Sequence, residues 1–550
     1  MEKYDKLFIN GKIYTVDKNK SWAEAIAVSG NRISFVGTDY EAEAIKKDSK
    51  EIVDLKGRMV LPGFIDGHMH IYLAGPERLF KIMLHGLETE DDYLKEIKRY
   101  IDMHPDMEKY EGCGWINPAF GPKGPTRHSL DSICPDKPLV LDSGDHHSFW
   151  ANTKAIEYCG ITSETTVPEG NVIEREEDGY PSGVFREFAA IKLLDKARLK
   201  FTKEDFKSVI RDMQKFYGAY GVTTLFDAMV PADSLIVDAY RELAEEGELT
   251  CRIRGAFESS EHLSSEQVEN FIASRRKISG YKEKLKIEQV KVFIDGVIEG
   301  KTGYLKKPYN DEVDYCGNPI WNQEALSNMC IRADKEGFDL HFHVIGDAAI
   351  EMMVNCLDKV RDTNPDNDKR RPVATHLQIV DEGDIVRMAK NNIVCLSNPY
   401  WFFKEKGYYD GIEVPYLGER AEHEYPMKSL FDAGMTVGMG SDYSVTPDPN
   451  PLKGIQIAVT RLKEDAKSNT CKESDVLWPD ERVSLEQMIE AATFGNAYSN
   501  HDEDIIGTLE VGKLADFVVL EDNVFDVPVD EIHNIRVCMT IFDGEVVFKG

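Results

Sequence analysis

The stretch MVLPGFIDGHMH, residues 59–70, decides how the chain is interpreted, because it joins an apolar run to a pair of histidines. The apolar part is typical of a strand that is buried on both faces. Side chains at alternate positions of an extended segment point to the same side, so His68 and His70 are placed to chelate one metal ion. The alternative is a chance pair, since the chain has 14 histidines and a second pair occurs at His341-Phe342-His343.

Further apolar runs follow this one, and helical patterns such as KEDFKSVIRDMQKFYGAYG and PMKSLFDAG separate most of them. Strands that alternate with helices indicate parallel βα units, and eight such strands close a (β/α)8 barrel whose strand carboxyl ends carry the chemistry. The predicted strands are Met59–Asp66, Val222–Asp227, Cys251–Phe257, Val290–Asp295, Asp339–Val344, Val373–Leu377, Ile393–Ser397 and Thr436–Gly440. We therefore predict an α/β fold with a TIM-like barrel over residues 59–499.

The connection between the first two predicted strands is far longer than a helix and two loops need. We predict that it contains an inserted subdomain at about residues 85–205. A long connection at this place is more often a lid or a binding loop than filler.

Both ends of the chain have a β pattern, with KLFINGKIYTV near the start and GTLEVGKLADFVVL and VCMTIFDGEVVFKG near the end. Asn10-Gly11 and Asp543-Gly544 are typical hairpin turns. Neither terminal segment is large enough to bury a face alone. Residues 1–58 and 500–550 are therefore predicted to form one small β-sandwich domain.

The composition of the chain limits the kinds of molecule that the protein is expected to bind. The chain has 97 acidic and 66 basic side chains, a net charge of −31, which repels nucleic-acid phosphates and anionic membrane surfaces. The opening MEKYDKLFING lacks the features of a secretory signal, so we expect a cytoplasmic protein. The ten cysteines include no C-x-x-C pair, which argues against a zinc knuckle. The expected partner is a small-molecule substrate, and a homo-oligomer is compatible with the sequence.

Polar residues that a buried strand should avoid recur along the later strands. Lys291 lies in one strand, His343 and His376 end the next two, and Asp442 follows the last. Each has an ordinary alternative, such as a core histidine, a lysine that snorkels to the surface or an aspartate that caps a helix. Their recurrence at the ends of successive barrel strands favours a shared site.

Seven motifs resemble the amidohydrolase superfamily, and within it the amidohydrolase family 3 group that includes enzymes similar to N-substituted formamide deformylase. The resemblance covers nearly the whole chain. The motifs are LPGFIDGHMH (61–70), GVTTLFDA (221–228), VKVFIDG (290–296), HVIGDAA (343–349), ATHLQIV (374–380), the block 417–461 around Asp442, and GTLEVGKLADFVVL (507–520).

The resemblance implies a metal centre of one or two divalent ions, with zinc expected. The matching ligand positions are His68, His70, Lys291, His343, His376 and Asp442. Lys291 matches a lysine that many members carboxylate to bridge two ions, and a lysine can be a ligand only if it loses its charge. Imidazoles and carboxylates suit zinc. Asp442 is expected to accept the proton of the attacking water and return it to the leaving nitrogen.

The predicted insertion also matches the group at PLVLDSGDHHSFWAN, residues 138–152. His147 is expected to hold or polarise the substrate, with a surface histidine as the alternative. Trp150 and Asn152 lie on the same pattern as candidate substrate-binding residues. Glu187 matches a recurring acidic position, against the alternative of a charge on a helix face. Asn398 stands where relatives often carry glutamine, which bears on substrate specificity.

These observations predict a metal-dependent hydrolase that cleaves a C–N bond of an amide, formamide or cyclic amide. Deamination of a ring amine uses the same attack and stays open. A non-catalytic member of the fold is the third alternative. It is disfavoured because such proteins typically lose ligands, and all six candidates are present.

Overall fold

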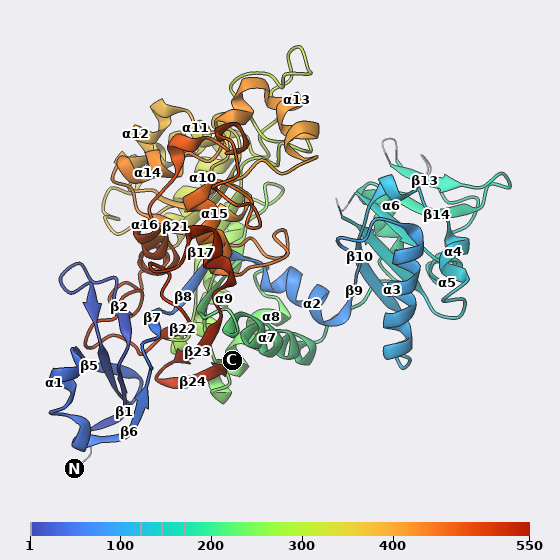
Figure 1. Cartoon of the computed structure of the whole chain (residues 1–550). Coiled ribbons are helices and arrows are strands. Elements are labelled where there is room, and N and C mark those ends of the chain that lie inside the picture. Colours follow the sequence, from blue (N-terminus) through green and yellow to red (C-terminus); the bar gives the residue numbers. More distant parts are fainter. Residues whose placement is uncertain (1–2, 121–123, 145–146, 169–170) are drawn as a thin grey trace. The chain divides into compact units, whose positions relative to one another are not determined.

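The computed structural model describes residues 3–120, 124–144, 147–168 and 171–550. The chain divides into two compact units, one made of Met1–Tyr72 with Ile210–Gly550 and one made of Leu73–Val209 (Figure 1). The second unit includes the segment that the sequence marks as an insertion, residues 85–205.

The first unit is built around an eight-stranded sheet with the order β21-β20-β19-β18-β17-β16-β15-β8. Neighbouring strands pair in parallel. The strands are β8 (Phe64–Met69), β15 (Val222–Val230), β16 (Arg252–Glu258), β17 (Leu285–Phe293), β18 (Asp339–Val344), β19 (Val373–His376), β20 (Val394–Ser397) and β21 (Val437–Met439). This sheet fits the predicted TIM-like barrel.

Backbone hydrogen bonds join the first and last strands of this sheet. Asp442 N donates to His68 O at 2.7 Å, and His70 N donates to Tyr443 O at 3.0 Å. Gly440 permits the approach, since a Cβ there would lie 2.6 Å from His68 N. The histidine pair and Asp442 are thus brought together although they lie at opposite ends of the barrel sequence.

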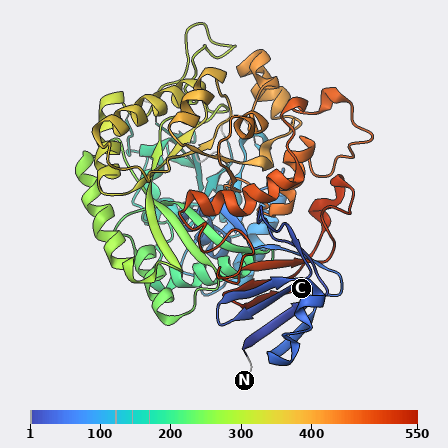
Figure 2. The same cartoon turned by 90° about the vertical axis from the view of Figure 1, so that its left-hand side faces the viewer.

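Helices surround the barrel strands (Figure 2). The helices that lie wholly or partly in the first unit are α1 (Asp39–Ala42), α2 (Ile71–Phe80), α7 (Lys203–Gly218), α8 (Leu235–Glu246), α9 (Val268–Ile278), α10 (Gln323–Lys335), α11 (Asp347–Thr363), α12 (Glu382–Lys390), α13 (Val414–Leu417), α14 (Met427–Asp432), α15 (Pro451–Thr460), α16 (Leu485–Glu490) and α17 (Asn496–Ser499). Local sequence sets their ends. The Asn322 side chain accepts from Ala325 N at the start of α10, and Gly247 ends α8 at φ 73°. Among the described residues, none of the helices combines the length and apolar character needed to cross a membrane.

The two ends of the chain form two smaller sheets, with the orders β5-β4-β1-β6 and β24-β23-β22-β7-β2-β3. Their strands are β1 (Tyr4–Ile9), β2 (Lys12–Tyr14), β3 (Trp22–Ala23), β4 (Ala25–Ser29), β5 (Arg32–Gly37), β6 (Ser49–Asp54), β7 (Met59–Pro62), β22 (Phe517–Leu520), β23 (Val537–Phe542) and β24 (Glu545–Lys549). One apolar cluster includes residues of both sheets, and Phe8 meets Phe517 edge to face with centroids 5.1 Å apart. The N- and C-terminal strands lie side by side in Figure 2. The two ends thus share a core, and the sandwich arrangement stays a prediction.

The first predicted strand, Met59–Asp66, is two strands in the structure. β7 pairs with β22 and β2, whereas β8 starts at Phe64 in the barrel sheet. Gly63 lies between them, and a Cβ at this position would lie 2.2 Å from Thr223 Oγ1. The prediction of one strand is wrong because the apolar run is continuous although its two halves belong to different sheets.

Only one of the two predicted hairpin turns is a hairpin. Asp543-Gly544 joins the antiparallel strands β23 and β24, with φ 50° and 80° as a two-residue turn requires. Asn10-Gly11 instead joins β1 to β2, which belong to different sheets. The Asn10-Gly11 prediction is wrong because tertiary pairing overrides the local turn signal.

The second unit has its own six-stranded sheet, in the order β13-β14-β12-β11-β10-β9. Its elements are β9 (Ile82–Met83), α3 (Glu90–Met103), β10 (Tyr110–Trp115), α4 (Arg127–Asp131), β11 (Leu139–Ser143), β12 (Ser148–Ala151), α5 (Thr153–Tyr158), β13 (Val172–Arg175), β14 (Pro181–Arg186) and α6 (Phe188–Ile191). Tyr93 and Ile97 of α3 pack in one cluster with Trp115 and Trp150. This unit therefore buries a hydrophobic core of its own.

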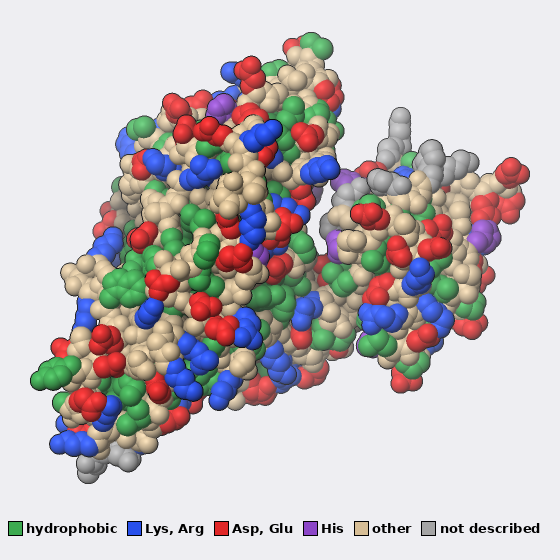
Figure 3. Space-filling model, in the orientation of Figure 1, with side chains coloured by type: hydrophobic (Ala, Val, Ile, Leu, Met, Phe, Trp, Pro, Cys, Tyr) green, Lys and Arg blue, Asp and Glu red, His purple; other side chains and the backbone are tan. Residues whose placement is uncertain are grey.

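Acidic and basic side chains are interspersed over the face of the molecule shown in Figure 3. Exposed ion pairs occur on the protein, such as Arg536 with Glu521 at 2.7 Å. Exposed pairs of this kind contribute little to stability.

Candidate active site

Polar side chains at the carboxyl ends of the barrel strands line a cavity of about 410 Å³. All six ligand candidates are among its lining residues: His68, His70, Lys291, His343, His376 and Asp442. The active sites of such barrels lie at this end of the strands. The cavity is therefore the candidate active site.

His68, His70 and Asp442 form a group that is fit to hold a metal ion. One ligand atom from each lies within 4.8 Å of the others. His70 Nε2 and Asp442 Oδ1 are 2.9 Å apart, yet Asp442 Oδ1 accepts no hydrogen bond from the described residues. Two ligands that each lie ~2.0–2.2 Å from one ion have this kind of separation. Because a buried carboxylate oxygen needs a partner, the geometry fits a divalent ion.

A chain of hydrogen bonds determines which ring nitrogen of His68 carries the proton. Gln289 Nε2 donates to Ser499 O, so Gln289 Oε1 is the acceptor for His341 Nδ1 at 2.8 Å. His341 Nε2 then carries the lone pair and accepts from His68 Nδ1 at 2.8 Å. His68 Nε2 is left without a proton, which is the form of imidazole that binds a metal.

His376 is oriented in the same way by Asn398. Asn398 Nδ2 donates to Gly440 O at 3.0 Å, and its Oδ1 accepts from His376 Nδ1 at 2.8 Å. The lone pair is therefore on His376 Nε2, which is buried without a hydrogen-bond partner among the described residues. Asn398 is itself fully buried. The structure shows it positioning a histidine, and its predicted contact with substrate stays a prediction.

His343 has its proton on the other ring nitrogen. Its Nε2 donates to Gly296 O at 3.1 Å, which leaves the lone pair on Nδ1. The His343 and His376 rings lie 4.5 Å apart between centroids. Two imidazoles with defined lone pairs thus lie side by side in the cavity.

Lys291 extends from β17 among these ligands. Its Nζ lies 3.1 Å from His68 Nε2, and its side chain is fully buried. Burial lowers the pKa of Lys291 to about 7, although the charges of Asp442 and Glu258 act in the opposite direction. The neutral amine is therefore accessible at neutral pH, unlike that of a solvated lysine.

Asp442 is held ionised and in a strained conformation. Burial alone raises its pKa, but the adjacent His70, His376 and Lys291 hold that pKa well below its usual range. Asp442 has φ 57° and His376 has φ 74°. Positive φ is uncommon for residues other than glycine, and such strain concentrates at functional sites.

Three supporting residues were missed by the sequence analysis, and all stand two positions before a predicted ligand. Gln289 precedes Lys291, His341 precedes His343, and Asp66 precedes His68. Asp66 accepts from Ser441 N at 2.9 Å and from Ser441 Oγ at 2.5 Å, which ties the end of β8 to the segment that carries Asp442. Burial raises the pKa of Asp66 to about 6. The same alternation that identified His68 and His70 could have found these residues.

His341→Ala is expected to weaken binding of a divalent ion by about 10–100-fold, because His68 loses the acceptor that sets its tautomer. Calorimetric titration of metal into chelator-treated protein measures this. The matched control is His501→Ala, which removes a ring that contacts Asp339 Oδ2 at 2.7 Å, at the start of the same strand. Equal loss in both variants would contradict the role of His341.

The candidate residues of the insertion lie in the second unit. His147 Nδ1 is 3.3 Å from Glu187 Oε2, and both exposed side chains line a cavity of about 470 Å³. Glu187 has φ 65°. Residues 145–146 of the predicted lid segment lie outside the described residues. The catalytic role of His147 and the substrate contact of Glu187 stay predictions.

Trp150 and Asn152 are fully buried within the second unit. Trp150 Nε1 donates to Thr126 O at 2.9 Å. Asn152 Oδ1 accepts from Ala155 N at 2.8 Å and caps α5. These contacts support the local fold, and the predicted substrate contacts of the two residues stay predictions.

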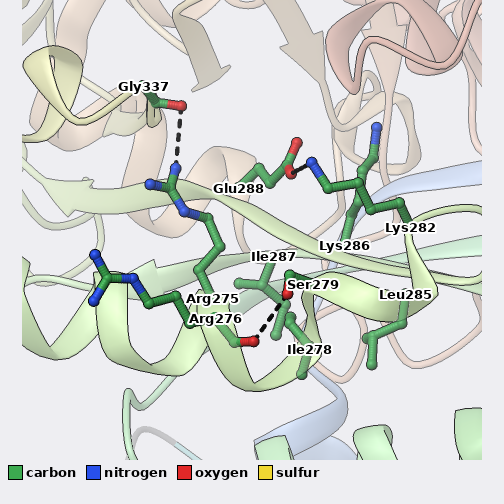
Figure 4. Close-up of a pocket in the computed structure, with 10 residues that line it drawn as sticks. All are labelled: Arg275, Arg276, Ile278, Ser279, Lys282, Leu285, Lys286, Ile287, Glu288 and Gly337. Atoms are coloured by element: carbon green, nitrogen blue, oxygen red, sulfur yellow. Dashed lines mark hydrogen bonds and ion pairs between the residues drawn. The ribbon is translucent and has the colours of Figure 1, made fainter.

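A separate cavity of about 460 Å³ lies at the start of β17, the opposite end of the strand from the ligand cavity (Figure 4). Three of its basic side chains are engaged with other groups. Arg275 donates to Glu336 O at 2.8 Å, Lys282 pairs with Glu288 at 3.4 Å, and Lys286 pairs with Asp502 at 2.8 Å. Charge pairs at this end of a barrel typically serve stability rather than catalysis.

An eight-stranded parallel barrel with histidines, a carboxylate and a buried lysine at its carboxyl end is typical of metal-dependent hydrolases. The model of the amidohydrolase family matches residues 51–548, and the chain belongs to this family. It is accordingly a hydrolase that acts on carbon–nitrogen bonds.

Known proteins match over almost the full chain. N-substituted formamide deformylase of Arthrobacter pascens is 27% identical over 99% of this chain and 98% of its own. Protein LONG AFTER FAR-RED 3 of Arabidopsis thaliana is 29% identical over 95% of this chain and 88% of its own. The crystal structure of an uncharacterized metal-dependent hydrolase from Pyrococcus horikoshii has a TM-score of 0.76 at 23% identity, covering 95% of this chain and 99% of that one.

Proposed function

We propose that this protein is a zinc-dependent hydrolase that cleaves an amide, formamide or cyclic amide bond of a small molecule. The observation that carries the proposal is the contact of Asp442 Oδ1 with His70 Nε2 at 2.9 Å without a hydrogen bond, beside the unprotonated Nε2 of His68. The similarity to N-substituted formamide deformylase supports the amide class. A divalent ion, when bound, supplies Lewis-acid activation of water.

Asp442 is the proposed proton shuttle. It is ionised at neutral pH because the adjacent His70 and His376 lower its pKa against the effect of burial. It can therefore accept a proton from the attacking water and later donate it to the nitrogen that leaves. Its strained backbone and its hydrogen bond to His68 O hold the carboxylate in place for both transfers.

Lys291 is proposed to be N-carboxylated. Its neutral amine adds to CO₂, one proton is released, and the lysine becomes a carbamate with two oxygens. An anionic side chain at this place suits a site of one or two divalent ions, whereas an ammonium 3.1 Å from His68 Nε2 repels a cation.

Product analysis tests the reaction. The protein is incubated with N-substituted formamides and with ring amines, with and without prior chelation. We expect formate and the free amine from the formamides, about one to two divalent ions per chain, and loss of turnover after chelation. Ammonia from ring amines without formamide cleavage would move the assignment to deamination. Turnover by metal-depleted protein would reject metal dependence.

A further inference from the structure

The cavity that holds the ligand candidates also carries three carboxylates, from Glu299, Glu405 and Glu413. Two basic side chains of the same segments are engaged elsewhere: Lys301 pairs with Asp311 at 2.7 Å and Lys404 with Glu422 at 2.6 Å. Within the described ranges, no ion pair joins the three cavity carboxylates to a basic side chain. In the part of the chain that the structure describes, these three acidic side chains therefore lack a cationic partner within ion-pair distance.

A fourth acidic side chain, Glu424, is buried beside Glu413. Gln378, which lines the cavity, donates its Nε2 to Glu424 Oε1 at 2.6 Å and to Glu413 Oε1 at 3.3 Å. Glu424 is 0% exposed and Glu413 is 5% exposed. Glu424 Oε2 has no hydrogen-bond partner among the described residues. Two buried acidic side chains thus share one amide donor, and Glu424 Oε2 is left without a donor among the described residues.

Burial, and then the charges of Glu299 and Glu405, raise the pKa of Glu413 to about 8. Glu413 is also the last residue of a π-helical turn, Tyr409–Glu413, and such turns occur frequently at functional sites. Glu413 is therefore mostly protonated at neutral pH, and a cation bound beside it would favour its ionised form.

Aromatic faces connect these carboxylates to the metal ligands. Trp401 lies parallel to the His376 ring, with centroids 5.6 Å apart and an interplanar angle of 17°. Tyr408 also lines the cavity, and its hydroxyl donates to Glu299 Oε2 at 2.8 Å. Aromatic faces attract cations and also pack against alkyl chains.

We propose that the substrate carries a cationic amine on an apolar stem, and that Glu299, Glu405 and Glu413 with the Trp401 and Tyr408 rings bind this end while the amide lies at the metal ligands. The substrate class is thus an N-(aminoalkyl) amide, which rests on the proposed hydrolysis. An ammonium group relieves the repulsion among the carboxylates, while a neutral or anionic tail leaves it in place.

Binding to the full-length protein tests the subsite without any turnover. The probe is butyltrimethylammonium, whose nitrogen has no lone pair and so cannot be a metal ligand. Calorimetry should show binding of this cation and at least about tenfold weaker binding of pentanoate. Equal binding of the two probes would overturn the subsite.

Variants that each replace one glutamate by glutamine test whether the cation binds at these side chains. Glu413→Gln should weaken binding of the cation by about tenfold or more. Glu299→Gln should have an effect of the same size, and its exposed position does not depend on the buried pair of Glu413 and Glu424. The matched control is Glu419→Gln, an exposed glutamate of the same region that does not line the cavity. Unchanged affinity in both cavity variants, or equal loss in the control, would overturn the assignment.

A pair of substrates separates this inference from the proposed function. N-(4-aminobutyl)formamide should be hydrolysed with a kcat/KM about tenfold or more above that of N-pentylformamide, which has a methyl group in place of the ammonium. Hydrolysis of both with no preference would overturn the subsite and keep the hydrolase. Cation binding without hydrolysis of either formamide would reject the proposed function and keep the subsite.

Discussion

Asp442→Asn is expected to fold with most of its metal and to lose about 10²–10⁴ in kcat. Asparagine preserves the shape of the side chain and its capping capacity, but it cannot accept and return a proton in each turnover. Steady-state kinetics across the pH range, together with metal analysis of the same sample, measure the effect.

The control for this change is Asp448→Asn, which replaces an aspartate that accepts from Asn450 N at 3.2 Å and lies outside the ligand cavity. It should keep a kcat close to that of the unmodified protein. A near-native kcat for Asp442→Asn at every pH would refute the proton shuttle and move the base elsewhere, with His147 and Glu187 as the next candidates.

Lys291→Ala is expected to lose bound metal and activity together, with partial rescue by short carboxylates such as formate or acetate. Alanine removes the proposed carbamate oxygens, and a small carboxylate can enter the space that the side chain leaves. Metal content per folded chain and the rate with added carboxylate measure both effects. A carbamate signal in ¹³C NMR after incubation with ¹³C-labelled bicarbonate tests the modification directly.

Lys286→Ala is the matched control on the same strand, since Lys286 pairs with Asp502 at 2.8 Å near the start of β17. It should retain metal in the fraction that folds. Retained metal in Lys291→Ala, or an unmodified ammonium in an experimental structure of the metal-loaded protein, would show that Lys291 does not bridge the ions.

Much of the barrel and the ligand set follows from local pattern. Apolar runs with helical segments between them predict the parallel strands because burial on both faces removes polar residues from them. Residues such as His376 and Asp442 then stand out at strand ends, where the polar side chain is expensive unless it has a role. The cavity brings all six predicted ligands together.

The supporting residues were only partly accessible from sequence. His341 and Gln289 stand two positions before ligands, so strand alternation points them into the barrel. Their function depends on which nitrogen holds the proton, and that is set by Ser499 O, a partner far along the chain. Asn398 likewise gains its role on His376 from the neighbouring strand.

The sequence by itself predicted the family through its motifs, the eight barrel strands through periodicity, and the six candidate metal ligands through the residue types at strand ends and the family resemblance. Tertiary structure alone decided the division of residues 59–66 at Gly63, the failure of Asn10-Gly11 as a hairpin, and the meeting of Glu299, Glu405 and Glu413 in one cavity. The physical reason is that the partner of a strand, the tautomer of a histidine and the interaction between acidic side chains all depend on groups that are distant in the sequence. The packing of the whole barrel brings these groups together.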